Sequence, residues 1–283
     1  MSENNIKDII IIGAGPAGAS TAVQLKKMGI EPFLVDSRGY AGGLIENAYK
    51  VENYIGSQST SGSNISENIK QHLESFNIKV IPATVIEIKE DDKNRFVIIT
   101  DSGIFTSKII VIAVGTSPKI YDTVEKNLKD NIFYDLVTLK DHPSFNSIQR
   151  IIIIGGGESA FDYALSLAAL KKDVLILVRG SSPKASGLLK KEVENHKKIK
   201  IIYKAEPNLI NDYIENNQLI LSAIGRRSAL DKIRIGFKFP HPMAFVIGDA
   251  EHGILGQLAI TCGEGIACAN LIAKIIKKEK EIN

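Results

Sequence analysis

The chain has 283 residues, 44% of them hydrophobic and 24% charged, with a formal net charge of +3. This length allows one large globular domain or two of ordinary size. A nucleic-acid partner is disfavoured, because it would need Lys and Arg concentrated on one face within a recognisable module, whereas here Lys is scattered along the chain.

The cysteine count and the N-terminus bear on where the protein resides. Two cysteines, Cys262 and Cys268, argue against a disulfide-stabilised secreted protein and favour a reducing compartment. Residues 1–8 lead straight into an apolar run without a signal-peptide pattern, and no apolar stretch approaches the roughly 20 residues that span a bilayer. We therefore expect a cytoplasmic protein that is neither exported nor inserted in a membrane.

A glycine-rich turn follows the first apolar run. Residues 9–12 are all Ile, which predicts a parallel strand buried on both faces, and they end in Gly13-Ala14-Gly15-Pro16-Ala17-Gly18. Residues 19–28 have the spacing of a helix, and residues 32–35 predict a second strand that closes on Asp36. This is the βαβ order of a dinucleotide-binding unit.

The same arrangement recurs in the middle of the chain. Residues 151–154 predict a strand, Gly155-Gly156-Gly157-Glu158-Ser159-Ala160 a turn, residues 161–170 a helix and residues 173–178 a second strand. In such a unit the glycines permit a tight turn and let a diphosphate approach the backbone, where it rests on the amides of the helix N-terminus. Two nucleotide sites are predicted; a glycine turn without a ligand is the alternative for each.

Each βαβ unit has a second strand, and the residues at the ends of these two strands predict different nucleotides. Asp36 would accept hydrogen bonds from an adenosine ribose with a free 2′-hydroxyl, as in FAD or NAD. The corresponding residue of the second copy is Val178, followed by Arg179 and, a little later, Lys184. Two cations without a carboxylate favour NADPH over NADH at the second site, although Arg179 as a solvated loop residue is the alternative.

Further segments resemble those of the thioredoxin-reductase-like flavoprotein disulfide reductase family, over nearly the whole chain. Residues 42–44 and 51–56 resemble that family's flavin-contacting segment, and residues 112–116 its crossover out of the FAD domain. Residues 245–249 resemble the strand whose Asp binds the ribityl chain, and residues 261–265 the helix start beneath the flavin.

This resemblance implies an α/β fold with two Rossmann-like nucleotide-binding domains, each a three-layer domain with a parallel sheet. The FAD-binding domain is expected at residues 1–117 and 243–283, split by an inserted, abbreviated NAD(P)H-binding domain at residues 118–242. The prolines at residues 117–118 and 240–242 are expected to mark the hinges. Dimerisation is usual in the family, so the resemblance also implies a homodimer.

The motifs and the resemblance together predict the cofactor-binding residues. Those predicted for FAD are Gly13, Gly15, Pro16, Ala17, Gly18, Asp36, Gly43, Leu44, Asn53, Val85, Ala113, Gly115, Thr116, Gly248, Asp249, Leu258 and Ala259. Those predicted for NADPH are Gly155, Gly157, Glu158, Ser159, Ala160, Arg179, Lys184, Gly225 and Arg226.

The chain departs from thioredoxin reductases where those enzymes hold a Cys-x-x-Cys. The corresponding residues 133–140 contain no sulfur, so a disulfide cannot be reduced there, because the exchange needs an attacking and a resolving thiol. The chain instead resembles the thioredoxin-reductase-like ferredoxin (or flavodoxin)–NADP reductases, which implies an FAD-dependent NADPH oxidoreductase with a small acidic electron carrier, ferredoxin or flavodoxin, as partner.

Two segments of the chain are also shorter than the corresponding segments of these relatives. The chain ends soon after the helix expected at residues 265–277, where ferredoxin reductases continue over the flavin, so an accessible flavin and small acceptors such as quinones or oxygen are also considered. The connection between residues 203 and 219 is short, which abbreviates the nucleotide domain, yet residues 223–227 still resemble the family's segment beside the nucleotide.

Two other functions stay open. One is a disulfide reductase or oxidase that uses Cys262, since a helix N-terminus would lower the pKa of that thiol; Cys268, six residues on, is poorly placed to pair with it. The other is a flavin-binding sensor or electron-transfer subunit with a degenerate nucleotide site.

No metal site and no catalytic side chain are predicted. His142, His241 and His252 lack metal-ligand spacing; His252 is considered as a proton donor near the flavin or as an ordinary loop residue. Glu158 is expected to interact with its helix dipole or the nucleotide. FAD would itself perform the redox chemistry, while the protein supplies binding and position.

Overall fold

The computed structural model describes residues 6–120, 130–205, 213, 218–253 and 256–282. Contacts divide the chain into two units, each an α/β unit with its own sheet. Unit 1 comprises Met1–Glu46, Glu52–Ser117 and Arg227–Asn283, and unit 2 comprises Asn47–Val51 and Pro118–Arg226.

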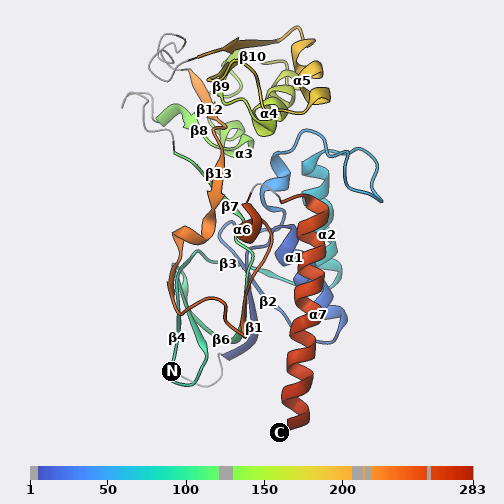
Figure 1. Cartoon of the computed structure of the whole chain (residues 1–283), viewed down its shortest axis with the longest axis vertical. Helices are drawn as coiled ribbons and strands as arrows, with labels where there is room; N and C mark the ends of the chain where they lie inside the picture. Colours follow the sequence, from blue (N-terminus) through green and yellow to red (C-terminus); the bar gives the residue numbers. More distant parts are fainter. Residues whose placement is uncertain (1–5, 121–129, 206–212, 214–217, 254–255, 283) are drawn as a thin grey trace. The chain divides into compact units, whose positions relative to one another are not determined.

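Four parallel strands form the centre of the sheet of unit 1 (Figure 1). They are β1 (Ile6–Ile12), β2 (Phe33–Asp36), β3 (Val80–Pro82) and β6 (Gly103–Ile112), in the order β6-β1-β2-β3. Ile10 pairs with Phe33 on one side and Ile110 on the other. The predicted strand–turn–helix–strand order at the N-terminus is confirmed.

The sheet of unit 1 extends beyond β6 through antiparallel pairs. β4 (Val85–Glu90) and β5 (Phe96–Thr100) continue the sheet, and β14 (Arg234–Gly236) adds to its edge on β4. β15 (Ala244–Val246) pairs with β6 in parallel. Because β14 belongs to this sheet, residues 227–242 lie in unit 1, whereas the sequence placed them in the nucleotide domain.

Helices cover one face of this sheet, and the strands are buried on both faces. α1 (Pro16–Lys27), α2 (Gly62–Ser75) and α7 (Leu258–Ile282) contribute to a core with Ile9 and Ile11, whereas Ile10 and Ile12 point into a second cluster with β4 and β5. The N-terminus of α2 is capped by the Ser61 hydroxyl, which accepts the N–H of Asn64.

α7 begins earlier and is more apolar than the sequence analysis expected. An 18-residue window within Leu258–Lys278 has a mean hydropathy of 1.5, and by length and composition alone this helix could cross a membrane. The expectation that no segment has this property is wrong, because isolated polar residues do not lower the mean enough. One face of the helix nevertheless packs in unit 1, where Cys268, Ala269 and Ile272 are buried in the core.

Unit 2 contains a five-stranded parallel sheet among its described residues. The strands are β8 (Ile132–Phe133), β9 (Arg150–Ile154), β10 (Asp173–Val178), β11 (Ile199–Tyr203) and β12 (Leu219–Ser222), in the order β11-β10-β9-β12-β8. Its helices are α3 (Leu136–Lys140), α4 (Glu158–Ala169) and α5 (Gly187–Glu194). The second predicted βαβ unit is therefore also present.

Short elements occur where the chain passes between the units. β7 (Thr116–Pro118) and β13 (Arg226–Ser228) form a two-stranded sheet with each other, and the 3-10 helix η2 (Gly43–Asn47) also spans a unit boundary. The 3-10 helix η5 (Ala229–Lys232) and the short helix α6 (Asp249–His252) lie within unit 1. The first expected hinge, residues 117–118, lies at a unit boundary; the second boundary falls at Arg226–Arg227 rather than at residues 240–242.

Candidate functional site

The first glycine turn closes tightly on the neighbouring strands. Gly13 has φ +105°, and its N–H donates to the carbonyl of Val35 at 2.7 Å. A Cβ on Gly13 would lie 2.3 Å from the carbonyl oxygen of Ala113, and one on Gly18 would lie 1.9 Å from the carbonyl oxygen of Gly13. Only glycine fits at these two positions, which is why the backbone can turn directly from β1 into α1.

The N-terminus of α1 presents backbone donors without a competing anion. Its N-cap residue is Gly15, which has no side chain to cap the helix, and Pro16 occupies the first turn. The first turn, which is fully described, carries no acidic residue. Since helix N-terminal amides and the helix dipole favour an anion, this end suits a diphosphate.

Asp36 lies at the end of β2 beside the same turn. Its Oδ2 accepts the N–H of Ala14 at 2.8 Å, and its Oδ1 accepts the N–H of Arg38 at 2.9 Å. A carboxylate offers about four acceptor positions, so both oxygens can take a further hydrogen bond. This geometry fixes the Asp36 carboxylate beside the turn; its binding of ribose hydroxyls stays a prediction.

Other segments that contain predicted FAD residues converge on the start of α1. Gly42 donates its N–H to the Ala14 carbonyl at 3.0 Å, and a Cβ on Gly43 would lie 2.9 Å from the Cα of Gly15. Gly248, at φ +69°, approaches Ala17 so closely that a Cβ there would lie 3.0 Å from the alanine methyl. Segments far apart in the sequence thus surround one helix N-terminus.

The remaining FAD candidates occupy different positions in unit 1. Asn53 donates from its side chain to Gln257 at 2.7 Å, directly before Leu258 and Ala259 at the start of α7. Val85 begins β4, which β5 and β6 separate from β1 in the sheet.

The other four candidates lie in or beside short elements. Asp249 begins α6. Gly115 adopts φ +65° and accepts the N–H of Ala229 through its carbonyl at 2.9 Å, and Thr116 begins β7. Leu44, in η2, is 37% exposed.

The second glycine turn repeats the geometry of the first within unit 2. Gly155 has φ +146°, its N–H donates to Leu177 at 3.0 Å, and a Cβ on it would lie 2.3 Å from the carbonyl oxygen of Ala223. A Cβ on Gly156 would lie 2.7 Å from the side chain of Val178. The repeat seen in the sequence is thus a repeat of backbone contacts.

A loop that carries two cations folds against the start of α4. The N–H of Lys184 donates to the Gly156 carbonyl at 2.6 Å, and the N–H of Ser186 donates to the Glu158 carboxylate at 2.6 Å. Arg179 and Lys184 are exposed. These contacts bring the part of the loop that carries Lys184 to the glycine turn, and Glu158 acts as an anchor of the loop.

The other predicted nucleotide residues lie on either side of the turn. Gly157 is the N-cap of α4, followed by exposed Ser159 and fully buried Ala160. Gly225 adopts φ +117°, and its carbonyl accepts the N–H of Lys119 at 3.0 Å, next to Arg226 at the start of β13.

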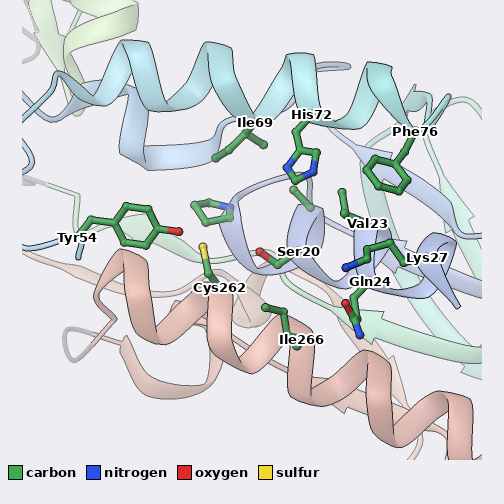
Figure 2. A pocket seen from close by; sticks show the side chains of 12 residues that line it. Ser20, Val23, Gln24, Lys27, Tyr54, Ile69, His72, Phe76, Cys262 and Ile266 are labelled. Carbon is green, nitrogen blue, oxygen red and sulfur yellow. The ribbon is translucent and has the colours of Figure 1, made fainter. Parts of the chain in front are cut away.

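Cys262 lies in a pocket of unit 1 between α1, α2 and α7 (Figure 2). The pocket has a volume of about 400 Å³. The Cys262 thiol forms hydrogen bonds with Ser20 and Tyr54, whose hydroxyls point toward it. Burial nevertheless raises the pKa of Cys262 above its ordinary value, with the two hydrogen bonds opposing it. The expectation of a lowered thiol pKa is wrong, because Cys262 lies a full turn inside α7, away from its N-terminal amides.

Cys268 is not placed for thiol exchange. It is buried in the core of unit 1, and burial raises its pKa to about 12. Neither cysteine forms a disulfide.

The three histidines considered from the sequence, His142, His241 and His252, have separate local partners. His142 and His241 each accept a backbone N–H two residues on, from Ser144 and Met243, both at 3.2 Å. His252 lies 2.8 Å from Glu264. Within the described ranges, no group of three His, Cys, Asp or Glu side chains is placed to hold a metal ion.

Three polar anchors were not predicted from the sequence. Glu264 accepts the N–H of Gly248, and Asp162 accepts the N–H of Tyr49 at 2.8 Å. Asn47 accepts the N–H of Leu136 at 2.8 Å. For Glu264 and Asp162 the available signal was a carboxylate on an otherwise apolar helix. No local signal marks Asn47, because its partner lies 89 residues away.

Two α/β units of the Rossmann type, each with a helix that begins at a glycine turn, are the arrangement of the class of two-nucleotide flavoproteins. Comparison with known proteins gives the family: residues 7–232 match the pyridine nucleotide-disulphide oxidoreductase family. The chain belongs to this family of FAD-dependent, pyridine-nucleotide-using oxidoreductases.

Individual relatives agree on the family and differ in activity. The chain is 33% identical over 230 residues to a ferredoxin–NADP reductase of Ligilactobacillus salivarius, covering 78% of this chain and 66% of the relative. It is 30% identical over 203 residues to a thioredoxin reductase of Borreliella burgdorferi, covering 71% and 61%. Less than two thirds of each relative's length is therefore aligned.

Solved structures show the same fold. Lactococcus lactis thioredoxin reductase superposes with a TM-score of 0.80 at 22% identity, covering 96% of this chain and 99% of that one. The two-domain Rossmann architecture predicted from the sequence is confirmed.

Proposed function

We propose that this protein is a cytoplasmic FAD-dependent oxidoreductase that takes electrons from NADPH and delivers them to a small acidic electron carrier, a ferredoxin or a flavodoxin. The observation that carries this proposal is the repeated glycine cradle. Unit 1 joins it to the Asp36 carboxylate, and unit 2 joins it to a loop bearing Arg179 and Lys184.

The residues of unit 1 fit FAD. Gly13 and Gly18 leave no room for side chains, so the backbone of the turn is open to a diphosphate beside the uncapped N-terminus of α1. Asp36 would accept the adenosine ribose hydroxyls, and Asp249 would accept those of the ribityl chain. When bound, FAD supplies hydride acceptance and the release of electrons to an acceptor.

The residues of unit 2 fit NADPH. The turn at Gly155 would receive the diphosphate, and Arg179 and Lys184 would pair with the 2′-phosphate, for which a guanidinium is well suited. The chain supplies binding and orientation here, and no general acid or base is required of it.

The cysteines favour a protein electron acceptor over a disulfide. The chain has two cysteines, both on α7; the thiolate is the reactive form, and burial raises both pKa values. Alkylation of Cys262 should therefore leave NADPH-dependent turnover unchanged. Loss of turnover on alkylation, with the FAD content intact, would instead favour the disulfide reductase.

An anaerobic titration of the purified protein with NADPH and, separately, NADH tests the donor. Flavin absorbance should bleach at far lower concentrations of NADPH than of NADH. Bleaching by neither would reject the NADPH reductase and favour a flavin-binding sensor, for which Glu158, an acid at the second helix start, is the supporting observation.

Steady-state turnover tests the acceptor. NADPH oxidation should be stimulated by ferredoxin or flavodoxin and not by oxidised thioredoxin. We extend the proposal to a homodimer, as in the family, which sedimentation of the FAD-loaded protein would test.

A further inference from the structure

Glu264 of α7 holds both ends of the short helix α6. Its Oε2 accepts the N–H of Gly248, the N-cap of α6, at 2.7 Å. Its Oε1 lies 2.8 Å from Nε2 of His252, the last residue of α6. A single carboxylate therefore connects the start and the end of the helix that begins with Asp249.

This turn needs an anchor from outside itself. Gly248 has φ +69° and is buried, so its N–H requires an acceptor, and a helix of four residues has little stability of its own. A carboxylate acceptor makes a stronger hydrogen bond than a neutral one. The Glu264 side chain is only 24% exposed, which limits competition from water.

Two further contacts restrict the same turn. The Ser228 hydroxyl donates to the carbonyl of Ala250 at 2.7 Å. Gly256 passes so close to Asp249 that a Cβ on it would lie 1.6 Å from Oδ1. The carboxylate of Asp249 is thus confined between the chain at Gly256 and a turn whose backbone Glu264 fixes.

We propose that Glu264 is a positioning residue of the flavin site: by joining Gly248 to His252, it holds Asp249 in the orientation that binds the ribityl chain. This inference rests on the proposed assignment of FAD to unit 1. Glu264 acts through the turn, and its contribution appears as flavin affinity and as the asymmetry of the flavin environment.

The test compares variants of the full chain by titrating flavin-free protein with FAD and following flavin fluorescence. Glu264→Ala should raise the FAD dissociation constant at least about tenfold, about 1.4 kcal/mol, because the Gly248 N–H loses a charged acceptor. Glu264→Gln keeps an oxygen acceptor and should stay within about threefold of the wild type. Glu251→Ala, which removes an exposed carboxylate from the same helix, is the matched control and should change nothing.

A second readout distinguishes a role of Glu264 in positioning Asp249 from a role in the stability of the protein. The visible circular dichroism of the bound flavin should change in Glu264→Ala and return in Glu264→Gln, while the KM for NADPH stays unchanged. If Glu264→Ala does not fold, His252→Asn takes its place, and a changed flavin dichroism is expected.

Three results would overturn the inference. The first is a Glu264→Ala variant that is less stable but binds FAD with the wild-type dissociation constant and dichroism. The second, if that variant does not fold, is an unchanged dichroism in His252→Asn. The third is a wild-type chain that binds no FAD, which would reject the proposed function as well; FAD binding by the wild type together with the first result rejects only the role of Glu264.

Discussion

The two glycine turns share a backbone and differ in the charges around it. Gly13 and Gly155 each abut the carbonyl of an alanine at the end of a neighbouring strand, with the same 2.3 Å to an added Cβ. The first turn has Asp36 beside it and no acid in the helix start, whereas the second has Glu158 in the helix start and two cations in its loop. In the proposed function, the shared backbone binds a diphosphate at each turn, and the different side chains select the nucleotide.

The helices that follow the turns differ at an equivalent position. Ser20 lies five residues after the N-cap of α1, where it contacts the Cys262 thiol, and Asp162 lies five residues after the N-cap of α4, where it accepts the N–H of Tyr49. The second helix therefore carries a half-buried carboxylate that anchors residues 47–51. The two copies share two glycines of the turn, Gly13 and Gly15 in one and Gly155 and Gly157 in the other, and differ in the side chains that face other segments.

The largest effect is expected from a substitution that disrupts the first glycine turn. Gly13→Ala places a Cβ at 2.3 Å from a carbonyl oxygen and forces a left-handed backbone, which alone costs about 1–2 kcal/mol. The variant should purify with little or no FAD and unfold at a lower temperature. Gly157→Ala, where nothing lies within 4 Å of the new Cβ, is the control and should retain FAD. Stoichiometric FAD in Gly13→Ala would contradict this.

The next largest effect is expected from removal of the two cations beside the second glycine turn. Removing both, in Arg179→Ala with Lys184→Ala, should raise the KM for NADPH by about 10- to 100-fold, because charged hydrogen bonds contribute about 1.5–3 kcal/mol. The KM for NADH should stay the same, since NADH lacks the 2′-phosphate. Lys191→Ala, an exposed lysine on α5, is the control. An equal rise for NADPH and NADH would show that the loop does not read the 2′-phosphate.

A smaller effect should separate the charge of Glu158 from its anchoring role. Glu158→Gln retains an acceptor for Ser186 and removes a negative charge from the helix start, so NADPH should bind severalfold more tightly. Glu158→Ala also loses the anchor, and its preference for NADPH over NADH should fall. Identical behaviour of the two variants would refute the anchoring role; the measurement is the pair of dissociation constants for each nucleotide.

The smallest effect on either nucleotide site is expected from Asp162. Titration of its carboxyl group should change the free energy of unfolding of the protein. Burial raises the pKa of this carboxyl to about 6 in the folded protein from an ordinary 3.8. The folded state therefore binds this proton more tightly than the unfolded state, and the associated stability is present below about pH 4 and lost as the pH rises through about 6.

Asp162→Asn cannot titrate and serves as the reference for this effect. The wild-type free energy of unfolding minus that of the variant should fall between about pH 4 and 6 and then level off. Urea unfolding over this pH range measures it. A difference that does not vary with pH would contradict the assignment.

Local patterns predicted the βαβ units well, because buried parallel strands and glycine turns leave a signature in consecutive residues. The strand at residues 173–178 was predicted with the bounds of β10, whereas α1 begins at Pro16 and not at Ala19, since small residues at the helix start carry no apolar period. Non-local features were missed. The addition of β14 to the sheet of unit 1 depends on pairing with β4, which nothing in residues 234–236 encodes alone.

The parts of the candidate site that depend on glycine turns were predicted from the sequence. The parts that depend on contacts between residues far apart in the sequence were not. Gly13, Gly155 and Asp36 lie where the motifs require. The anchoring role of Glu264 depends on α7 packing beside the turn at Gly248, and the raised pKa of Cys262 depends on burial. Both are products of tertiary packing, so the helix pattern by itself predicted the wrong direction for the thiol.

The most direct test of the two-site account is anaerobic flavin reduction by NADPH in Gly155→Ala beside the wild type. The substitution places a Cβ at 2.3 Å from the Ala223 carbonyl oxygen in unit 2 and leaves unit 1 unaltered. We predict that the variant retains wild-type FAD content but is not reduced at NADPH concentrations that bleach the wild type. Reduction at wild-type concentrations, or loss of FAD from the variant, would contradict the assignment of one nucleotide to each unit.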